Sequence, residues 1–447
     1  MASVHLRAAA RVTRTTLSTI VLGLTAAWLA GGTAQATDGY FQYGYGARQS
    51  ALGGAGVADS RDAMALSLNP AGLVDVDRQL QLGVSLFLPY RSYTATGTVF
   101  VAPGSYDSKG TIFPVPNMAY SSPIDGDSAW GIALYGNGGM NTNWPNMTNT
   151  AFGGGIGVFC DGSQLHIDLM QAFVSLGYAR RFGAFSVGIA PTAAIQRIRV
   201  QGLGNFAGVS SDPANLTSGD YSYSYGGGLR LGAQWKVMPN VRLGVAGQTP
   251  MWMTKFHKYA GLFANNGNFD IPATVTAGVA WDVMPNVTLM ADYKHIFYGS
   301  VASVANSMTS PAQLGMSSGS GFGWHDIDIV KLGAEWRYSP KWTFRVGWSH
   351  NTNPITASNV TFNIMAPGVV TDHFTGGFAY KATPHSTLEF AAAYVPPNSV
   401  NGPEKAGTTA APTAGSNIDV SMHQFQFTLG YTYEFGPDKP VQPMYHK

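Results

Sequence analysis

Apolar and polar residues alternate along several long stretches of this chain. Over residues 80–88, four leucines and a valine occupy the even positions, and most residues between them are polar or small. Near the C-terminus, apolar residues at the odd positions of 425–435 alternate with Gln, Thr, Gly and Glu. Successive side chains of a β-strand point to opposite faces, so this period of two predicts strands with one apolar and one polar face.

Fourteen segments show this pattern. They cover residues 79–96, 110–121, 128–139, 165–181, 185–199, 223–236, 241–251, 271–282, 287–297, 326–337, 342–351, 370–381, 386–395 and 419–435. An even number of strands returns the chain to the side on which it started, as bacterial outer-membrane barrels require. Trp235, Trp281 and Trp336 lie near strand ends, where a membrane barrel carries its aromatic belts.

A short turn motif recurs between these segments. Val237-Met238-Pro239-Asn240 and Val283-Met284-Pro285-Asn286 are identical, and Pro340 and Pro384 occupy equivalent places. Proline presets φ at the second position of a tight turn. The other connections are long and rich in Gly, Ser, Asn and Thr, at 140–164, 201–222, 252–270, 298–325, 352–369 and 396–418. Short turns on one side and long loops on the other predict an all-β fold, a transmembrane antiparallel β-barrel. A soluble β-sandwich or a periplasmic barrel is the alternative.

The composition favours the membrane barrel. Only 11% of the residues are charged, and 55 are glycine. Beyond residue 36 no apolar run reaches the ~18 residues that would indicate a transmembrane helix. Apolar and polar residues are thus interleaved, as in a wall with lipid on one side and a wet lumen on the other.

Residues 1–36 have the features of a cleaved signal peptide. Arg7, Arg11 and Arg14 form a basic region, residues 17–30 are mostly apolar, and Ala34-Gln35-Ala36 has the small-x-small form of a cleavage site. An uncleaved anchor is the alternative. When these three arginines are subtracted from the 26 Lys and Arg, the remaining basic residues nearly balance the 24 Asp and Glu. We therefore expect no nucleic-acid partner.

Few features of the sequence indicate metal or cofactor chemistry. The one cysteine, Cys160, cannot form an internal disulfide. We find no His/Cys cluster with metal-ligand spacing and no Gly-rich phosphate loop. The sequence therefore predicts neither a metal nor a cofactor.

Residues 37–78 precede the first strand and do not alternate. They are rich in small residues between Ala51 and Gly56, which permits close packing. The segment is too long for a simple terminal tail, so we expect it to plug the lumen of a barrel formed by residues 79–435. Residues 436–447 would form a periplasmic tail. Barrels of this kind usually end on an aromatic residue of the last strand; here Phe435 is followed by a tail, which departs from that pattern.

The plug segment resembles the N-terminal hatch of FadL-type outer-membrane transporters. The resemblance rests on Asp38-Gly39-Tyr40-Phe41-Gln42, on residues 50–58 and 62–65, and on Asn69-Pro70-Ala71-Gly72-Leu73 just before the first strand. Residues 255–264 and 269–272 provide a second match. The family carries long-chain fatty acids, and relatives carry aromatic hydrocarbons. The resemblance implies capture of a ligand by the outer loops, a shift of the hatch, and lateral exit through a gap in the wall at a kinked third strand.

The resemblance also assigns roles to residues of this chain. The outer loop would capture the ligand through Met251, Trp252, Phe256, Tyr259, Leu262 and Phe263. The hatch would act through Tyr40, Phe41, Asn69, Pro70 and Ala71, with the Asn-Pro-Ala triplet touching the kink. Gly136, Gly138 and Gly139 would form the kink, because glycine within a strand weakens pairing and often marks a bulge. The plainer alternatives are a loop packed onto the barrel rim, an ordinary Asn-Pro turn, and an early start of the next loop.

Ten charged residues fall at predicted lumen positions. They are Arg230, Arg242, Lys294, Lys331, Arg337 and Arg345, with Asp282, Asp292, Glu335 and Glu389. Lys294, Lys331 and Arg345 are the candidates for contact with a ligand carboxylate. The alternative is that these charges pair with one another and with the hatch.

The sequence thus predicts a monomeric barrel in the outer membrane of a Gram-negative bacterium that takes up long-chain fatty acids. Its other expected partners are outer-membrane lipid, lipopolysaccharide and the barrel assembly machinery. An importer of aromatic or alkyl hydrocarbons, a diffusion porin and a surface receptor are the alternatives. An enzyme is not expected, because His166, His295, His373 and His423 occur singly and outside any nucleophile motif.

Overall fold

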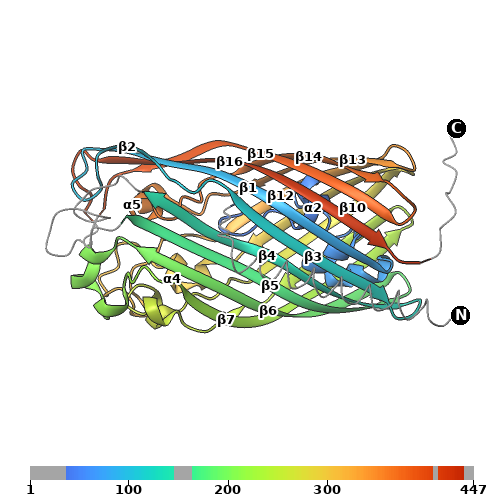
Figure 1. Ribbon diagram of the computed structural model, residues 1–447, viewed down its shortest axis with the longest axis horizontal. Coiled ribbons are helices and arrows are strands. Elements are labelled where there is room, and N and C mark those ends of the chain that lie inside the picture. Colours follow the sequence, from blue (N-terminus) through green and yellow to red (C-terminus); the bar gives the residue numbers. More distant parts are fainter. Residues whose placement is uncertain (1–36, 145–163, 406–410, 437–447) are drawn as a thin grey trace, which may run out of the picture.

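The computed structural model describes residues 37–144, 164–405 and 411–436. The predicted signal peptide, Cys160 and the tail beyond Gly436 lie outside the described residues. One antiparallel sheet closes into a barrel of long tilted strands (Figure 1). Fourteen long strands form the wall: β1 (Gln79–Thr96), β3 (Phe113–Pro123), β4 (Ser128–Trp144), β5 (Leu165–Phe182), β6 (Phe185–Gln201), β7 (Ser222–Met238), β8 (Val241–Gln248), β10 (Thr274–Met284), β11 (Val287–Ile296), β12 (Ile327–Arg337), β13 (Trp342–Asn351), β14 (Asp372–Lys381), β15 (Ser386–Gly402) and β16 (Asn417–Glu434).

The remaining elements are short. Strands β2 (Gly104–Asp107) and β9 (Trp252–Met253) extend the sheet at its outer end. The outer loops contain η3 (Gly204–Val209), η4 (Pro213–Asn215), η5 (His257–Tyr259), α3 (Ala264–Gly267), η6 (Tyr298–Ser300), α4 (Ala302–Ala305), η7 (Ala357–Asn359) and α5 (Val360–Asn363). None of the helices in the described ranges is long and apolar enough to cross a lipid bilayer.

Pairing of the first and last strands closes the wall. Strands β1 and β16 are in register from Gln79 opposite Glu434 to Thr96 opposite Asn417. Each other wall strand pairs with the wall strands before and after it, so the sheet has no open edge. The fourteen-stranded barrel predicted from the alternation is confirmed.

Several predicted strand boundaries were wrong. β15 was expected to end at residue 395, but after a register shift between Val395 and Asn398 its pairing with β16 continues to Gly402. β4 was expected to end at 139 but continues to Trp144, because one extra residue is absorbed between Gly136 and Gly138. A bulge interrupts the hydrogen-bonded ladder without ending the strand. A prediction that ends each strand at residues such as glycine and proline therefore places the end of the strand too early.

Two further predicted boundaries lie too far toward the outer loop. β8 ends at Gln248 rather than at 251, and β10 begins at Thr274 rather than at 271. Pro250 and Pro272 lie in the gap between these two strands and cannot donate to a ladder. Only an isolated bridge between Met251 and Ile271 continues the pairing.

The outer face of the wall is apolar. Leu176, Val346 and Leu429 are among the most exposed large apolar side chains, at 54%, 61% and 59%. Trp235, Trp281 and Trp336 are about half exposed and lie shortly before the short turns that join β7–β8, β10–β11 and β12–β13. This placement matches the aromatic belt expected where such a wall meets the membrane surface.

The N-terminal segment, residues 37–78, lies inside the barrel. It contains α2 (Gly46–Ala51), η1 (Ala63–Ser67) and η2 (Pro70–Asp75). Figure 1 shows α2 enclosed by the wall, nearer the end at which β1 begins and β16 ends. Residues 37–60 are all buried, although they form little regular structure.

Wall glycines allow the backbone of this segment to touch the sheet. A Cβ added to Gly188 of β6 would lie 2.4 Å from the amide nitrogen of Ala71. One added to Gly347 of β13 would lie 2.1 Å from the carbonyl carbon of Leu52. These glycines within strands therefore serve close approach rather than flexibility.

Replacement of Gly188 by valine is expected to unseat residues 69–73, because the new Cβ overlaps their backbone. We expect a loss of roughly 1–3 kcal/mol in the free energy of unfolding, as for other overpacked sites. Faster amide hydrogen exchange at Ala71 and Gly72 would accompany it. Gly376→Val in β14 is the matched control, because the nearest atom to its added Cβ is 3.6 Å away. Equal exchange in both variants would contradict the close-approach role of Gly188.

Candidate functional site

An apolar space, here the outer chamber, lies among the outer loops. It contains about 460 Å³ not filled by protein atoms. Its lining consists of Ile167, Val200, Leu203, Phe206, Leu262, Phe263, Ser303, Leu314, Ser320, Gly321, Phe322, Phe362 and Met365. No lining residue is charged. This uncharged, mostly apolar lining is chemically suited to an apolar small molecule or to part of a longer chain.

The six residues predicted for ligand capture differ in their position and in their exposure. Leu262 and Phe263 line the outer chamber, and Trp252 is 61% exposed. Phe256 and Tyr259 are fully buried beneath the chamber.

The loop therefore does not present all six of these residues at its surface. The Tyr259 hydroxyl donates to the Asp220 carbonyl at 2.6 Å, and the ring of Phe263 packs against those of Phe256 and Tyr259. This compact packing covers Met251 as well, which is 0% exposed.

A second space, the middle cavity, lies next to the outer chamber. It holds about 290 Å³ and is lined by Phe87, Pro89, Arg91, Met140, Asn141, Trp324, Ala366, Pro367, Gly368 and Met422. The two spaces draw on the same loop segments, since Phe322 and Met365 line the first and Trp324 and Ala366 line the second.

The rings of Tyr40 and its neighbours connect the middle cavity with the N-terminal segment. The ring centre of Tyr40 is 5.8 Å from that of Trp324, 4.9 Å from that of Tyr298 and 6.1 Å from that of Phe269. The Tyr298 hydroxyl accepts a hydrogen bond from the Tyr40 amide and donates to the Asp38 carbonyl. The predicted hatch residues Tyr40 and Phe41 are thus fully buried parts of the lumen core.

The N-terminal segment pairs directly with the bulge in β4. The Gly139 amide donates to the Tyr40 carbonyl at 2.9 Å, and the Gln42 amide donates to the Asn137 carbonyl at 2.9 Å. A Cβ on Gly138 would lie 1.7 Å from the Tyr40 oxygen, so the contact requires glycine there. The predicted irregularity at Gly136, Gly138 and Gly139 lies within a continuing strand, and the alternative of an early loop was wrong.

The Asn-Pro-Ala triplet was expected at this kink but lies elsewhere. The Asn69 side-chain amide donates to the carbonyls of Val57 and of Ala233 in β7 at 2.8 and 3.1 Å, and its oxygen accepts from the Ala71 amide. Pro70 and Ala71 lie against Gly188 of β6. Asn69 caps η2, and this turn directs the triplet to the wall at β6 and β7.

Two of the three candidate carboxylate contacts, Lys294 and Lys331, converge on one internal carboxylate. The Nζ atoms of Lys294 in β11 and Lys331 in β12 lie 3.5 and 3.1 Å from Oδ2 of Asp38. Lys331 also donates to the Tyr43 carbonyl at 2.6 Å. Both lysines and Arg230 line a third space, the inner cavity, of about 430 Å³. This region of the lumen therefore already accommodates a carboxylate.

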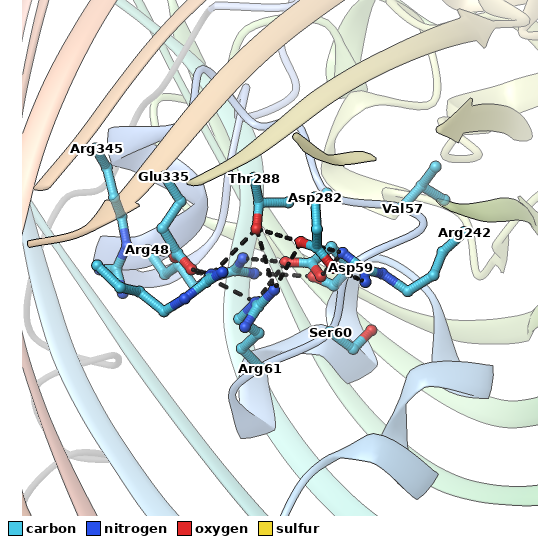
Figure 2. Close-up of polar contacts among 12 residues, drawn as sticks. Arg48, Val57, Asp59, Ser60, Arg61, Arg242, Asp282, Thr288, Glu335 and Arg345 are labelled. Atoms are coloured by element: carbon cyan, nitrogen blue, oxygen red, sulfur yellow. Dashed lines mark hydrogen bonds and ion pairs between the residues drawn. The ribbon is translucent and has the colours of Figure 1, made fainter. Parts of the chain in front are cut away.

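Arg345 belongs instead to an ion network. It pairs with Glu335 at 3.0 Å and with Glu389 at 2.7 Å. Figure 2 shows the network continuing across the lumen from Arg345 and Glu335 to Arg48 and Asp59 of the N-terminal segment. Both carboxylates that pair with Arg345 thus belong to the protein itself.

The same network attaches the N-terminal segment to several strands. Arg48 pairs with Asp59 at 2.6 Å and with Glu335 at 3.0 Å, and Arg61 pairs with Asp59 at 2.7 Å. Arg242 of β8 joins Asp59 to Asp282 of β10, at 2.8 and 2.5 Å (Figure 2). Because opposite charges alternate, each buried ion has a partner, which offsets its desolvation.

The charged lumen residues that sequence reasoning missed include Arg48 and Asp59 of the ion network, and also Asp38 and Arg91. Asp38 lies in the non-alternating segment, where no pattern reports the direction of a side chain. Arg91 continues the inward-facing odd positions of β1, so extending the alternation beyond residue 88 would have found it. No group of His, Cys, Asp and Glu suited to a metal ion occurs within the described ranges.

A closed wall with an apolar outer face and an occupied, chambered lumen defines a membrane barrel with internal binding space. The model of the outer membrane transport proteins (OMPP1/FadL/TodX) matches residues 23–435. The chain belongs to this family and is located in the outer membrane. No curated protein sequence matches it.

Solved structures of family members have the same fold. The Pseudomonas putida toluene transporter TodX is 18% identical with a TM-score of 0.65, over 89% of this chain and 100% of that one. The Ralstonia pickettii toluene transporter TbuX is 20% identical with a TM-score of 0.58, over 88% and 99%. A Pseudomonas aeruginosa FadL homologue is 16% identical with a TM-score of 0.65, over 89% and 100%.

Replacement of Glu335 by glutamine is expected to destabilise the seated N-terminal segment. The change leaves Arg48 and Arg345 facing each other without their shared carboxylate. Loss of one partner of a buried pair usually costs about 3–5 kcal/mol, which denaturant unfolding of the barrel in vesicles would measure. Lys258→Gln is the control, because its pair with Asp220 is exposed and should contribute little. Similar unfolding of both variants would contradict the anchoring role of the network.

Proposed function

We propose that this barrel imports long-chain fatty acids across the outer membrane. The observation that carries the proposal is the change from an uncharged to a cationic lining between two cavities of the lumen. The outer chamber has no charged lining residue, whereas the inner cavity contains Lys294 and Lys331. An amphipathic acid matches both, since its tail gains about 25 cal/mol per Å² of buried apolar surface and its carboxylate gains two cationic partners.

Capture would take place at the outer chamber. Leu262 and Phe263 come from the predicted capture loop, and Phe322 and Met365 come from two other outer loops. A site made from several loops closes over a flexible tail and excludes water. The methionine and phenylalanine side chains adapt to tails of different shape.

Release of the N-terminal segment would follow when the carboxylate reaches the lysine pair. Asp38 now occupies that pair, and Tyr40 and Gln42, only a few residues further on, hold the β4 bulge. A ligand carboxylate that replaces Asp38 would loosen the same short stretch that covers the bulge. Residues 37–42 would then act as the moving part of a hatch, and the ligand would leave sideways at β4.

Import of aromatic hydrocarbons is the second candidate. The uncharged lining of the outer chamber would also suit a neutral ligand. TodX and TbuX are toluene transporters of the same fold. A neutral ligand would use the chamber without needing the lysine pair.

Uptake of labelled oleate and labelled toluene by a host without its own fatty-acid barrel would test the proposal. We expect the protein to accelerate oleate entry. Leu262→Trp should reduce it severalfold, because the larger side chain fills the chamber. Val209→Trp is the control, because Val209 is an exposed residue of η3 outside the chamber lining.

The outcomes separate the candidates. Accelerated entry of toluene alone would assign the barrel to hydrocarbons. If neither compound enters faster than in the empty host, although the folded barrel is present in the outer membrane, import of both is refuted.

A further inference from the structure

Arg91 of β1 is a buried cation that has no acidic partner among the residues that the structure describes. Only 4% of the residue is exposed. Its Nη2 donates to the Ser108 hydroxyl and to the carbonyls of Lys109 and Gly110, at 3.2, 3.1 and 2.6 Å. Its Nε has no hydrogen-bond partner, and no carboxylate in the described parts of the chain forms an ion pair with it.

This environment differs from that of three lumen arginines in the ion network. Arg48, Arg242 and Arg345 each pair with two carboxylates. Neutral oxygens and the face of Phe113, 5.8 Å from the guanidinium carbon, offset the charge of Arg91 only in part. A buried guanidinium that lacks an anion is unfavourable, so a ligand that supplied one would be bound strongly.

The rest of the middle cavity is suited to a hydrocarbon chain. Phe87, Met140, Trp324 and Met422 are large apolar residues of its lining. Arg91, whose Nε has no hydrogen-bond partner, therefore lines a cavity that is otherwise largely apolar. A cation at one side of such a space matches a ligand with one anionic group and a long apolar tail.

We propose that the middle cavity is a binding site for the carboxylate end of a long-chain fatty acid, with Nε of Arg91 donating to the carboxylate. This inference rests on the proposed function and adds a site to it. The position of the cavity supports a role as an intermediate stop. Its lining residue Ala366 follows Met365 of the outer chamber, and Trp324 packs on Tyr40 of the N-terminal segment.

A carboxylate held at Arg91 would leave the tail in or near the outer chamber. The ligand would therefore be oriented, head first, before it reaches Asp38 and the lysine pair. A neutral hydrocarbon would gain nothing from Arg91. The site would thus distinguish acids from hydrocarbons of the same length.

Calorimetric binding of oleate and methyl oleate to the full barrel in lipid nanodiscs would test this site. In Arg91→Gln we expect a class of oleate binding to weaken by about tenfold or more, the usual size of a charge-assisted hydrogen bond. Binding of methyl oleate should stay unchanged, since the ester carries no charge. Arg91→Lys should restore part of the oleate affinity, because it keeps the charge but loses Nε.

Arg78→Gln is the matched control, because Arg78 is an exposed arginine just before β1. Heat-modifiable migration on gels would verify that each barrel is folded. Should the glutamine variant fail to fold, a selective loss of oleate affinity in Arg91→Lys still decides the question.

Three other results would count against these ideas. Oleate isotherms that are unchanged in both Arg91 variants would overturn the site. Equal weakening of oleate and methyl oleate would also overturn it, because Arg91 would then only shape the cavity. Wild-type protein that binds methyl oleate but not oleate would instead refute the proposed function.

Discussion

Closure of the hydrogen-bonded wall is the constraint on which the rest of the structure depends. A strand in lipid cannot leave its backbone groups unpaired, so β16 must return to β1 along their full length. Closure leaves an interior that fourteen strands cannot fill with their own side chains. The N-terminal segment occupies part of it, and wall glycines such as Gly188 and Gly347 let its backbone rest against the sheet.

Charges inside this wall follow from the same constraint. Ions removed from water are tolerated where they are paired. In the network, Arg48 of the segment pairs with Asp59 of the segment and with Glu335 of the wall, and Asp59 also pairs with Arg242 of the wall. That network anchors residues 48–61. The stretch around Asp38 and Tyr40 is held differently, by two lysines and by backbone contacts to a bulge. One part of the segment is thus fixed by a charge network, while the other is held by groups with which, under the proposed function, a ligand would compete.

Binding spaces arise where this filling is incomplete. The outer chamber, the middle cavity and the inner cavity change from uncharged to singly cationic to multiply cationic in their lining. In the ion network Arg345 is paired with carboxylates of the protein, whereas Nε of Arg91 has no hydrogen-bond partner. Under the proposed function, the selectivity of such a barrel would therefore depend on a few cations of the cavity linings rather than on its net charge.

The sequence by itself determined the class of fold, the strand number and the short turns, because the alternation and the turn motifs are local properties of the chain. It also carried the resemblance to the family, which the family model bears out. The tertiary structure decided which residues meet. Arg48 and Glu335 are 287 positions apart, and no local pattern reports that they pair. For the same reason the sequence could not tell that Phe256 is buried, that Asn69 turns toward β7 rather than β4, or that Asp38 joins Lys331. Each of these contacts depends on where a non-periodic segment comes to rest against a distant strand, and that is determined by packing and by the pairing of buried charges.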